Sequence, residues 1–270
     1  MSKDLVIVAG AGDVGSRLAA LRIACGDDVI ALRRRDVAAS AGVRTHRANL
    51  ATGEGLSTLP RQAVSIVFCA APDQRDEAAY RGLYHDGLRR LLDACEAPRI
   101  VFVSSTAVYG QDAGEWVDEG TPAEPAAFNG RVLLDAERVL APRPGGTALR
   151  LSGIYGPGRE YLLRKARDGE PGEPRWTNRI HVQDAAAAIS HLLDLANPQP
   201  LYLGNDDLPA LETDVLAWVR DAERLPPVAA SSGPVRGRRV RNARLRASGW
   251  RPEHEDYRSG YAGLLAEPGL

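Results

Sequence analysis

The sequence contains a few side chains whose types and spacing could move a proton. "YLLRK" is the one place where a tyrosine, Tyr161, precedes a lysine, Lys165, by four positions. A phenol whose pKa is lowered by a nearby ammonium is a general acid or base near neutral pH. Ser105 and Tyr109 in "SSTAVYG", and His181 in "NRIHVQD", can also donate or accept protons. Which of them do chemistry depends on the elements that carry them.

A glycine-rich turn near the N-terminus points to phosphate binding. "LVIVAGAGDVGSRLA" places Gly10, Gly12 and Gly15 as G-x-G-x-x-G between an apolar strand and a helix. Gly10 makes the tight turn, Gly12 lets the backbone approach a diphosphate, and Gly15 lets the helix pack on the sheet. The helix start at Asp13 and Val14 offers free N–H groups to phosphates. The alternative is a strand–helix turn without a ligand.

The end of the second apolar run bears on which dinucleotide is bound. It reads "ALRRRD", with Arg33, Arg34 and Arg35, where enzymes that use NAD usually have an acidic residue for the ribose 2′-hydroxyl. A guanidinium can hold a 2′-phosphate bidentately, whereas a carboxylate repels it. The pattern favours NADP(H) over NAD(H). The alternative is a solvated arginine run, and the next residue, Asp36, is acidic.

Short apolar runs alternate with amphipathic stretches over the first 155 residues. This order is typical of an α/β fold, a Rossmann-type doubly wound parallel sheet. We expect residues 1–155 to form the NAD(P)-binding domain, with 178–205 returning to it. We expect 156–177 and 206–270 to form a small C-terminal substrate lobe. The expected strands are 5–9, 29–32, 64–70, 100–104 and 148–154, with a weaker one at 43–48, and the expected helices are 13–25, 77–94 and 131–140.

Composition excludes several classes of protein. With 44% hydrophobic and 26% charged residues and a net charge of −1, the 270-residue chain has no basic field for nucleic acid. The "GRRVRNAR" run lacks interleaved aromatic residues, so nucleic-acid binding is not expected. No apolar run reaches the roughly 18–20 residues that cross a bilayer. Three scattered cysteines and no signal peptide predict a cytoplasmic protein.

Three further motifs extend the match beyond the glycine turn. "IVFVSSTAVYG" (100–110), "SGIYGPGR" (152–159) and "NRIHVQDAAAAI" (178–189) follow one another in order. With them the chain resembles the extended short-chain dehydrogenase/reductase family, in its NAD-dependent epimerase/dehydratase branch. It is similar to an atypical subgroup with G-x-G-x-x-G at the first turn. The resemblance implies NAD(P) binding, a small-molecule substrate and, in many members, a homodimer formed through two helices per subunit.

The resemblance assigns roles to individual residues. Ser105, four positions before Tyr109, matches the family's catalytic Ser/Thr, whose hydroxyl would bond a substrate carbonyl or alcohol. "CAAP" lies where the chain lines the ribose and nicotinamide, and the 153–154 backbone would flank the nicotinamide. The residues that the resemblance places at the cofactor are Asn49, Ala70, Ala71, Ser104, Gly153 and Ile154.

The family's catalytic Tyr and Lys are missing. They belong to the pattern Pro-x-x-x-Tyr-Gly-x-Ser-Lys-x-x-x-Glu, and this chain reads "PAAFNGRVLLDAE". One register puts Asn129 and Leu133 at the two positions, and sliding by one gives Phe128 and Val132. Neither register supplies a phenol or an ammonium. The "YLLRK" pair comes roughly 30 positions too late, so we interpret it as a surface helix turn with a snorkelling lysine.

Another proton carrier would therefore be needed. Tyr109 is the first candidate and His181 the second, and the sequence leaves both open. Tyr155, Tyr80 and Tyr84 are weaker ones, since a phenol at a strand end is as often packing. Arg179 could anchor a loop or meet an anionic substrate, and Asp184 could cap the following helix. The five histidines show no ligand spacing, so no metal site is expected.

Two functions fit these patterns. The favoured one is an NADP(H)-dependent oxidoreductase or epimerase-type enzyme that uses Ser105 with a non-standard proton carrier. It would act on a small-molecule carbonyl, alcohol or sugar-type substrate. The alternative is a catalytically inactive NADP(H)-binding regulatory or sensor protein. The missing Tyr and Lys favour the alternative, whereas the strand-end serine and the substrate lobe favour the enzyme.

Overall fold

The computed structural model describes residues 3–35 and 41–266, and it divides into two compact units. Unit 1 comprises Met1–Tyr109, Ala123–Arg150 and Ala186–Tyr202. Unit 2 comprises Gly110–Pro122, Leu151–Ala185 and Leu203–Leu270. The expected division gave 178–205 to the first domain, whereas here 178–185 belongs to unit 2. Residues 110–122 also belong to unit 2.

A seven-stranded sheet in the order β11-β7-β5-β4-β1-β2-β3 organises unit 1. The pairs β2–β3, β1–β2, β1–β4 and β4–β5 are all parallel. β4 ("SIVF") is buried at every residue, as expected for a parallel strand covered on both faces. The strands are β1 (Leu5–Ala9), β2 (Asp28–Arg33), β3 (Val43–Arg47), β4 (Ser65–Phe68), β5 (Arg99–Ser105), β7 (Gly146–Leu151) and β11 (Leu201–Gly204).

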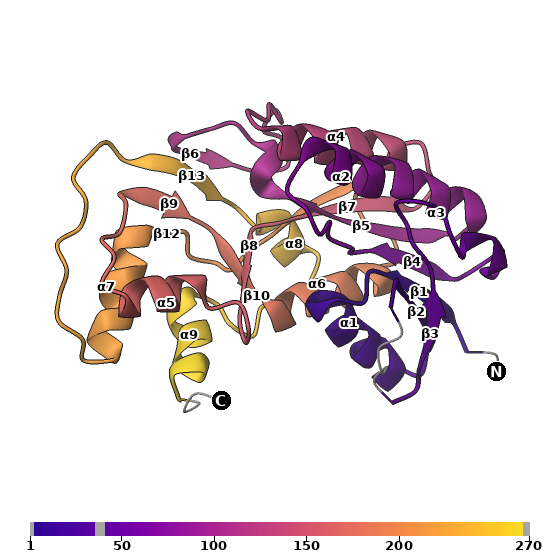
Figure 1. Ribbon diagram of the computed structural model, residues 1–270, viewed down its shortest axis with the longest axis horizontal. Coiled ribbons are helices and arrows are strands. Elements are labelled where there is room, and N and C mark those ends of the chain that lie inside the picture. The colour runs from indigo at the N-terminus through magenta and orange to yellow at the C-terminus, as the bar shows by residue number, and fades with distance from the viewer. Residues whose placement is uncertain (1–2, 36–40, 267–270) are drawn as a thin grey trace. The chain divides into compact units, whose positions relative to one another are not determined.

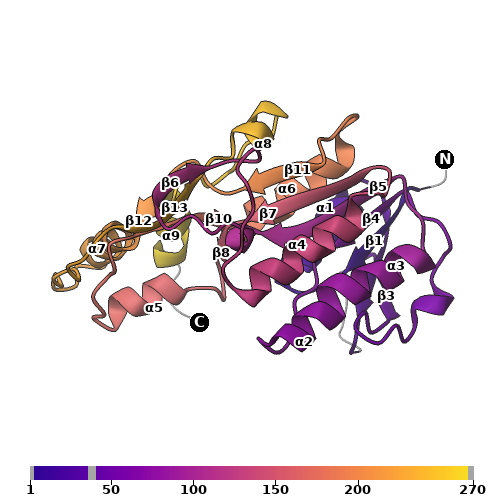
Figure 2. The ribbon, with the colours of Figure 1, turned by 90° about the horizontal axis from the view of Figure 1, so that it is seen from above.

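Helices cover both faces of this sheet (Figures 1 and 2). On one face lie α2 (Glu77–Tyr80), the π-helical segment η2 (Arg81–Gly87), α3 (Leu88–Ala94) and α4 (Phe128–Leu140). On the other lie α1 (Asp13–Ala24) and α6 (Val182–Asp194). Buried Arg22 of α1 ties these two together, because its guanidinium donates to Ser190 at 3.2 Å and to Asp194 at 2.8 Å. The expected doubly wound α/β fold is confirmed.

Unit 2 is built on a four-stranded sheet, β12-β9-β13-β6, and a parallel pair, β8–β10. Helices α5, α7 and α9 share one apolar core that includes Leu163, Val215 and Tyr261. The elements are β6 (Ala113–Val117), β8 (Gly153–Tyr155), α5 (Tyr161–Arg167), β9 (Arg175–Thr177), β10 (Arg179–His181), β12 (Ala210–Leu211), α7 (Glu212–Ala222), β13 (Arg236–Val240), α8 (Ala243–Ala247) and α9 (Tyr257–Ala266). Short 3₁₀ turns are η1 (Leu56–Thr58) and η3 (Thr106–Val108) in unit 1.

The expected strand 148–154 is wrong as a single element, because the chain changes partner at residue 152. The Ser152 N–H donates to the Gly204 carbonyl at 2.9 Å. One residue later the Gly153 N–H donates to the Asn178 carbonyl at 3.1 Å. β7 therefore ends at Leu151 and β8 begins at Gly153, a change that apolar composition alone could not reveal.

Candidate functional site

Five strands of unit 1 end at one edge of the sheet, and most of the expected site residues follow those ends. Gly10 follows β1, Arg33 ends β2, Asn49 follows β3, Ala70 follows β4 and Ser105 ends β5. Because these strands are parallel and adjacent, their carboxyl ends meet at the same edge. In open α/β sheets, ligands bind at this edge.

The glycines of the β1–α1 turn differ in what surrounds them. Gly10 has a φ of +103°, and a Cβ there would lie 2.3 Å from the Ala70 backbone. A Cβ on Gly15 would lie 2.2 Å from the Gly10 carbonyl oxygen. A Cβ on Gly12 would meet nothing within 4 Å. Packing within the chain therefore requires Gly10 and Gly15, whereas Gly12 keeps the space in front of the turn open.

Two side chains donate hydrogen bonds to carbonyl groups of the β1–α1 turn. The Cys69 thiol donates to the Gly10 carbonyl at 3.1 Å, and the Ser16 hydroxyl donates to the Ala11 carbonyl at the same distance. Burial raises the pKa of Cys69 to about 12, so the thiol stays protonated near neutral pH and remains a donor. These contacts fix two carbonyls of the turn, those of Gly10 and Ala11.

The N-terminus of α1 carries no side-chain cap. Gly12 is the N-cap residue, and it has no side chain that could accept a hydrogen bond from the first-turn amides. Asp13 is ion-paired with Arg17 at 3.1 Å, and Val14 is buried, so these two residues would offer a ligand their backbone. Uncapped amides at the positive end of a helix form a site for phosphate.

The arginines after β2 have different surroundings. Arg33 donates through Nη2 to Ser16 at 3.2 Å, while its buried Nε has no hydrogen-bond partner among the described residues. Exposed Arg34 grips both oxygens of Asp73, and these hydrogen bonds hold the pKa of that carboxyl below its usual value. Asp36 lies outside the described residues.

Asn49 and the alanines after β4 also lie at this edge. The Asn49 side-chain oxygen accepts from the Ala51 N–H at 3.1 Å, which closes the turn after β3. Ala70 packs its backbone against Gly10, and Ala71 is exposed. Gly153 and Ile154 begin β8 in unit 2, where Gly153 is exposed.

Ser105 ends β5 and is partly exposed. Its hydroxyl oxygen accepts from the Ala107 N–H at 3.2 Å, which caps η3 and fixes the side chain. A hydroxyl that accepts one bond still has its hydrogen to donate. Ser105 is thus placed to donate a hydrogen bond to a carbonyl oxygen.

Ser104 and Tyr109 lie in a buried polar group that we call the Glu137 cluster (Ser104, Tyr109, Glu137 and Arg150). Glu137 accepts from Ser104 at 2.6 Å and from Arg150 through two bonds of 3.0 and 2.7 Å. Arg150 also donates to the Tyr109 hydroxyl at 2.8 Å. Tyr109 is only 1% exposed, and this burial suits packing better than proton exchange with a substrate.

Helix α4 carries the residues that the resemblance aligns with the family's Tyr and Lys. A Cβ on Gly130 would lie 2.3 Å from the Ala107 carbonyl, so the helix rests directly on η3. Val132 and Leu133 are buried, and Asn129 is partly exposed. The structure therefore places only an amide and apolar groups where the sequence lacks the Tyr and Lys.

The Tyr161–Lys165 match is structural. Both residues lie on α5, and Tyr161 is 64% exposed. Lys165 donates to Glu212 at 2.6 Å, and this bond raises the pKa of the ammonium. The lysine joins α5 to α7 within unit 2.

Two weaker tyrosine candidates belong to an aromatic group in unit 1. The Tyr84 ring lies 5.4 Å from Tyr80 and 6.2 Å from Phe102, and Tyr80 lies 5.4 Å from Phe128. Burial raises the pKa of the Tyr84 phenol. These contacts are those of packed rings.

His181 is buried beside a histidine that the sequence did not single out as its partner. Its ring lies 3.8 Å from the His254 ring, and His254 Nδ1 lies 2.9 Å from the Asp184 carboxylate. Asp184 also accepts from the backbone N–H groups of Glu253 and His254, so it secures this loop.

The ligand atoms of His181, Asp184 and His254 lie within 4.8 Å of one another, a grouping that spacing along the chain could not predict. Because the two rings stack and the carboxylate already accepts three hydrogen bonds, we interpret the group as structural.

Comparison with known proteins decides the family. Residues 6–202 match the NAD dependent epimerase/dehydratase family. The chain belongs to this family. A Methylobacillus flagellatus protein classed as an NAD-dependent epimerase/dehydratase has 39% identity, with 98% of both chains covered and a TM-score of 0.87.

Two further relatives show how far the likeness extends. MoeE5, solved with UDP-glucose and NAD, is 25% identical, covers 95% of this chain and 96% of its own, and has a TM-score of 0.80. Protein YeeZ of Escherichia coli is 39% identical over 128 residues, which are 44% of this chain and 45% of YeeZ. The match with YeeZ therefore spans less than half of either protein.

Within the epimerase/dehydratase family, this member has the glycine-rich β1–α1 turn and has neither Tyr nor Lys at the aligned positions of α4. Sequence reasoning did not find Asp73 or His254 as partners, and it used Glu137 only to set the register of a pattern. The Glu at the end of the Pro-x-x-x-Tyr-Gly-x-Ser-Lys-x-x-x-Glu pattern was the one feature of the sequence that could have indicated the Glu137 cluster. No helix among the described residues is long and apolar enough to cross a membrane.

Proposed function

We propose that the protein is an NADP(H)-dependent oxidoreductase or epimerase-type enzyme that acts on a small-molecule carbonyl, alcohol or sugar-type substrate. The open space in front of Gly12 carries the proposal. Gly10 and Gly15 are explained by packing, but Gly12 has no neighbour that excludes a side chain. A diphosphate lying over the uncapped start of α1 accounts for it.

The preference for NADP(H) rests on Arg33. Its buried Nε needs an acceptor, and a 2′-phosphate beside the end of β2 would supply one. Arg34 would take part only by sharing its guanidinium with Asp73. When bound, the nicotinamide coenzyme supplies or accepts the hydride.

Ser105 is the residue that we assign to the substrate. Its hydroxyl would donate to the substrate oxygen and stabilise the charge that develops there. Tyr109 and His181 are 1% and 4% exposed, so each would need to open to reach a substrate. We therefore place Ser105 ahead of both, and Tyr109 and His181 stay predictions as proton carriers.

One relative supports a proposal for the substrate class. MoeE5 has been solved with UDP-glucose, which favours a sugar nucleotide for this chain as well. The alternative function is an inactive NADP(H) sensor, which the missing Tyr and Lys favour. A homodimer and a cytoplasmic location also stay predictions, and light scattering of the purified protein would test the dimer.

Gly12→Ala tests the open space directly. The new Cβ meets nothing within 4 Å, so the melting temperature should not change. Coenzyme binding measured by calorimetry should weaken by about tenfold or more, since the methyl group would lie where the diphosphate does. Gly82→Ala, equally open but far along the chain, is the control. Unchanged binding in Gly12→Ala would contradict the proposal.

Arg33→Glu and Ser105→Ala test the remaining parts. Arg33→Glu should weaken NADPH by about tenfold more than NADH, with Arg44→Glu on the exposed side of β3 as control. Equal losses would refute the coenzyme preference. Ser105→Ala should abolish turnover of sugar nucleotides or carbonyls while NADPH still binds, with Ser57→Ala as control. Tight NADPH binding without turnover by the unaltered protein would support the sensor.

A further inference from the structure

A second buried polar group lies inside unit 2, under helix α9. In the β8–β10 pair, Gly153 lies opposite Arg179 and Tyr155 lies opposite His181. Partners in a parallel pair point to the same face, as do residues two apart, so Arg179 and Tyr155 share one face. The Tyr155 ring lies 4.8 Å from Tyr261 of α9. The face is thereby covered by the C-terminal helix.

Helix α9 approaches this face closely. A Cβ on Gly260 would lie 1.8 Å from the Tyr155 hydroxyl oxygen, so only glycine fits there. The Arg179 guanidinium lies 5.2 Å from the Tyr257 ring centre, a cation–π contact. The aromatic side chains of α9 therefore seal the polar face from solvent.

We call Tyr155, Arg179 and Asp206 the Asp206 cluster. These side chains are 4%, 3% and 1% exposed. Among the described residues, no hydrogen-bond partner exists for the Tyr155 hydroxyl, for Arg179 Nη1 or for either Asp206 carboxylate oxygen. Tyr155 and Arg179 share one face of the β8–β10 pair, and the backbone of Asp206 is bonded to that of Arg179, so the three residues are neighbours. Buried polar atoms in native proteins have partners in the great majority of cases, so these four atoms require an explanation.

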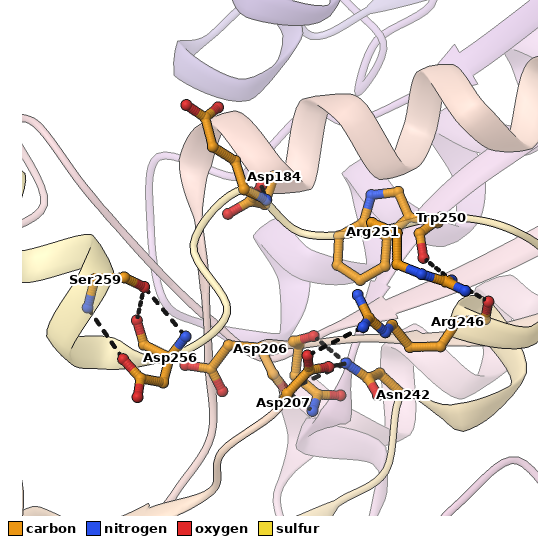
Figure 3. Close-up of polar contacts among 11 residues, drawn as sticks. Asp184, Asp206, Asp207, Asn242, Arg246, Trp250, Arg251, Asp256 and Ser259 are labelled. Carbon is orange, nitrogen blue, oxygen red and sulfur yellow. Dashed lines mark hydrogen bonds and ion pairs between the residues drawn. The ribbon is translucent and has the colours of Figure 1, made fainter.

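The backbone of the cluster is fixed on several sides. The Asp206 N–H donates to the Arg179 carbonyl at 2.7 Å. The Asp206 carbonyl accepts from the Asn205 and Asn242 side chains at 2.7 and 3.3 Å. Figure 3 shows the Asp206 carboxylate extending away from Asn242 and Arg246, with no dashed line reaching it. Arg179 is fixed as well, since its Nη2 donates to Thr177.

The electrostatics of the cluster agree with an incomplete pairing. Burial raises the pKa of Asp206 well above its ordinary value, and the positive charge of Arg179 offsets only part of this. The Leu208 amide also favours the carboxylate but does not reach hydrogen-bond geometry. The two charges thus act on one another without forming an ion pair.

We propose that the Asp206 cluster is a binding site for internal water, which bridges Arg179 Nη1 and the Tyr155 hydroxyl to the Asp206 carboxylate. The guest must accept from the guanidinium and donate to the carboxylate, and water does both. Arg179 would repel a metal cation, and Asp206 would repel an anion. An apolar guest would leave all four atoms without partners.

High-resolution crystals of the full chain test the site. We expect density for water within about 2.7–3.2 Å of both Arg179 Nη1 and an Asp206 oxygen. A direct Arg179–Asp206 ion pair, or the absence of such density, would overturn the proposal. Crystals grown with rubidium chloride should show no anomalous peak there, and a peak would mean that the guest is a cation.

Solution measurements give a second test. Oxygen-17 magnetic relaxation dispersion counts long-lived internal waters, and Asp206→Leu should lose at least one. If Asp206→Leu fails to fold, Tyr155→Phe serves instead, because it removes one hydroxyl and should shorten the residence time of the water. Asp207→Asn, on the exposed neighbour that pairs with Arg246, should keep the full count. An unchanged count in Asp206→Leu, or an unchanged residence time in Tyr155→Phe, would refute the site.

Discussion

The two units each bury an arginine, a carboxylate and a tyrosine, yet the two groups are arranged in opposite ways. In the Glu137 cluster, Arg150 and Glu137 meet through two hydrogen bonds of 3.0 and 2.7 Å, and Tyr109 accepts a third bond. In the Asp206 cluster, no hydrogen bond or ion pair joins the three side chains.

The difference comes from the backbone position that carries each acidic side chain. Glu137 lies on helix α4, and its long side chain reaches Arg150 on β7 in a bidentate geometry. Asp206 lies on backbone bonded directly to that of Arg179, and its shorter side chain forms no hydrogen bond with the guanidinium. The same three residue types therefore form a complete hydrogen-bond network in one cluster and none in the other, depending on where the backbone places them.

Glu137→Ala should have the largest effect on stability. It leaves the Arg150 guanidinium buried without its counter-charge, which typically costs about 3–5 kcal/mol. Urea unfolding of the two proteins measures the loss. Glu137→Gln keeps the bond to Ser104 and should lose less. A loss below about 1 kcal/mol for Glu137→Ala would show that this network is not closed in solution.

The next largest effect should be a difference in coupling energy between the two clusters, measured by double-mutant cycles. We expect a coupling of about 2–3 kcal/mol between Glu137→Gln and Arg150→Met, because these side chains touch. We expect less than about 1 kcal/mol between Asp206→Asn and Arg179→Met, because water would lie between them. Unfolding free energies of the six variants and the unaltered protein give both values. Equal couplings would remove the distinction.

Loss of the Lys165–Glu212 pair should lower the free energy of unfolding by an intermediate amount. Its side chains are 12% and 9% exposed, close to the 6% and 11% of Arg150 and Glu137, but one hydrogen bond joins them instead of two. Lys165→Met should therefore cost about 1 kcal/mol in urea unfolding. It should not change catalysis or coenzyme binding, and a loss of either would revive a catalytic reading of "YLLRK".

Loss of a surface ion pair should have the smallest effect on the free energy of unfolding. Arg138 pairs with Asp135 at 2.8 Å, but its side chain is 71% exposed. Arg138→Ala should change the free energy of unfolding by less than about 0.5 kcal/mol. A larger change would mean that exposed pairs cannot serve as the reference for the two buried clusters.

Much of unit 1 could be predicted from the sequence, because its strands, turns and helices depend on residues that are close together in the chain. The alternation of apolar runs with helices predicted the parallel sheet, and the expected strand 5–9 agrees with β1 at both ends. The glycine spacing predicted the β1–α1 turn, since strand, turn and helix follow one another directly. The missing Tyr and Lys could also be read from the chain, because a pattern can be compared without coordinates.

Pairing between distant segments could not be predicted. Nothing near Asp206 indicates that Arg179 lies beside it, and nothing near His181 indicates His254. The chain leaves β11 for β10 at residue 152 through backbone N–H bonds that every residue type except proline can make.

The amino-acid sequence by itself determined the class of fold, the glycine turn and the loss of the family's proton carriers, because each depends on residues close together in the chain. Only the tertiary structure decided which buried charges found partners. Partnership depends on side-chain reach and backbone direction, and these are set by elements that the chain brings together from far apart.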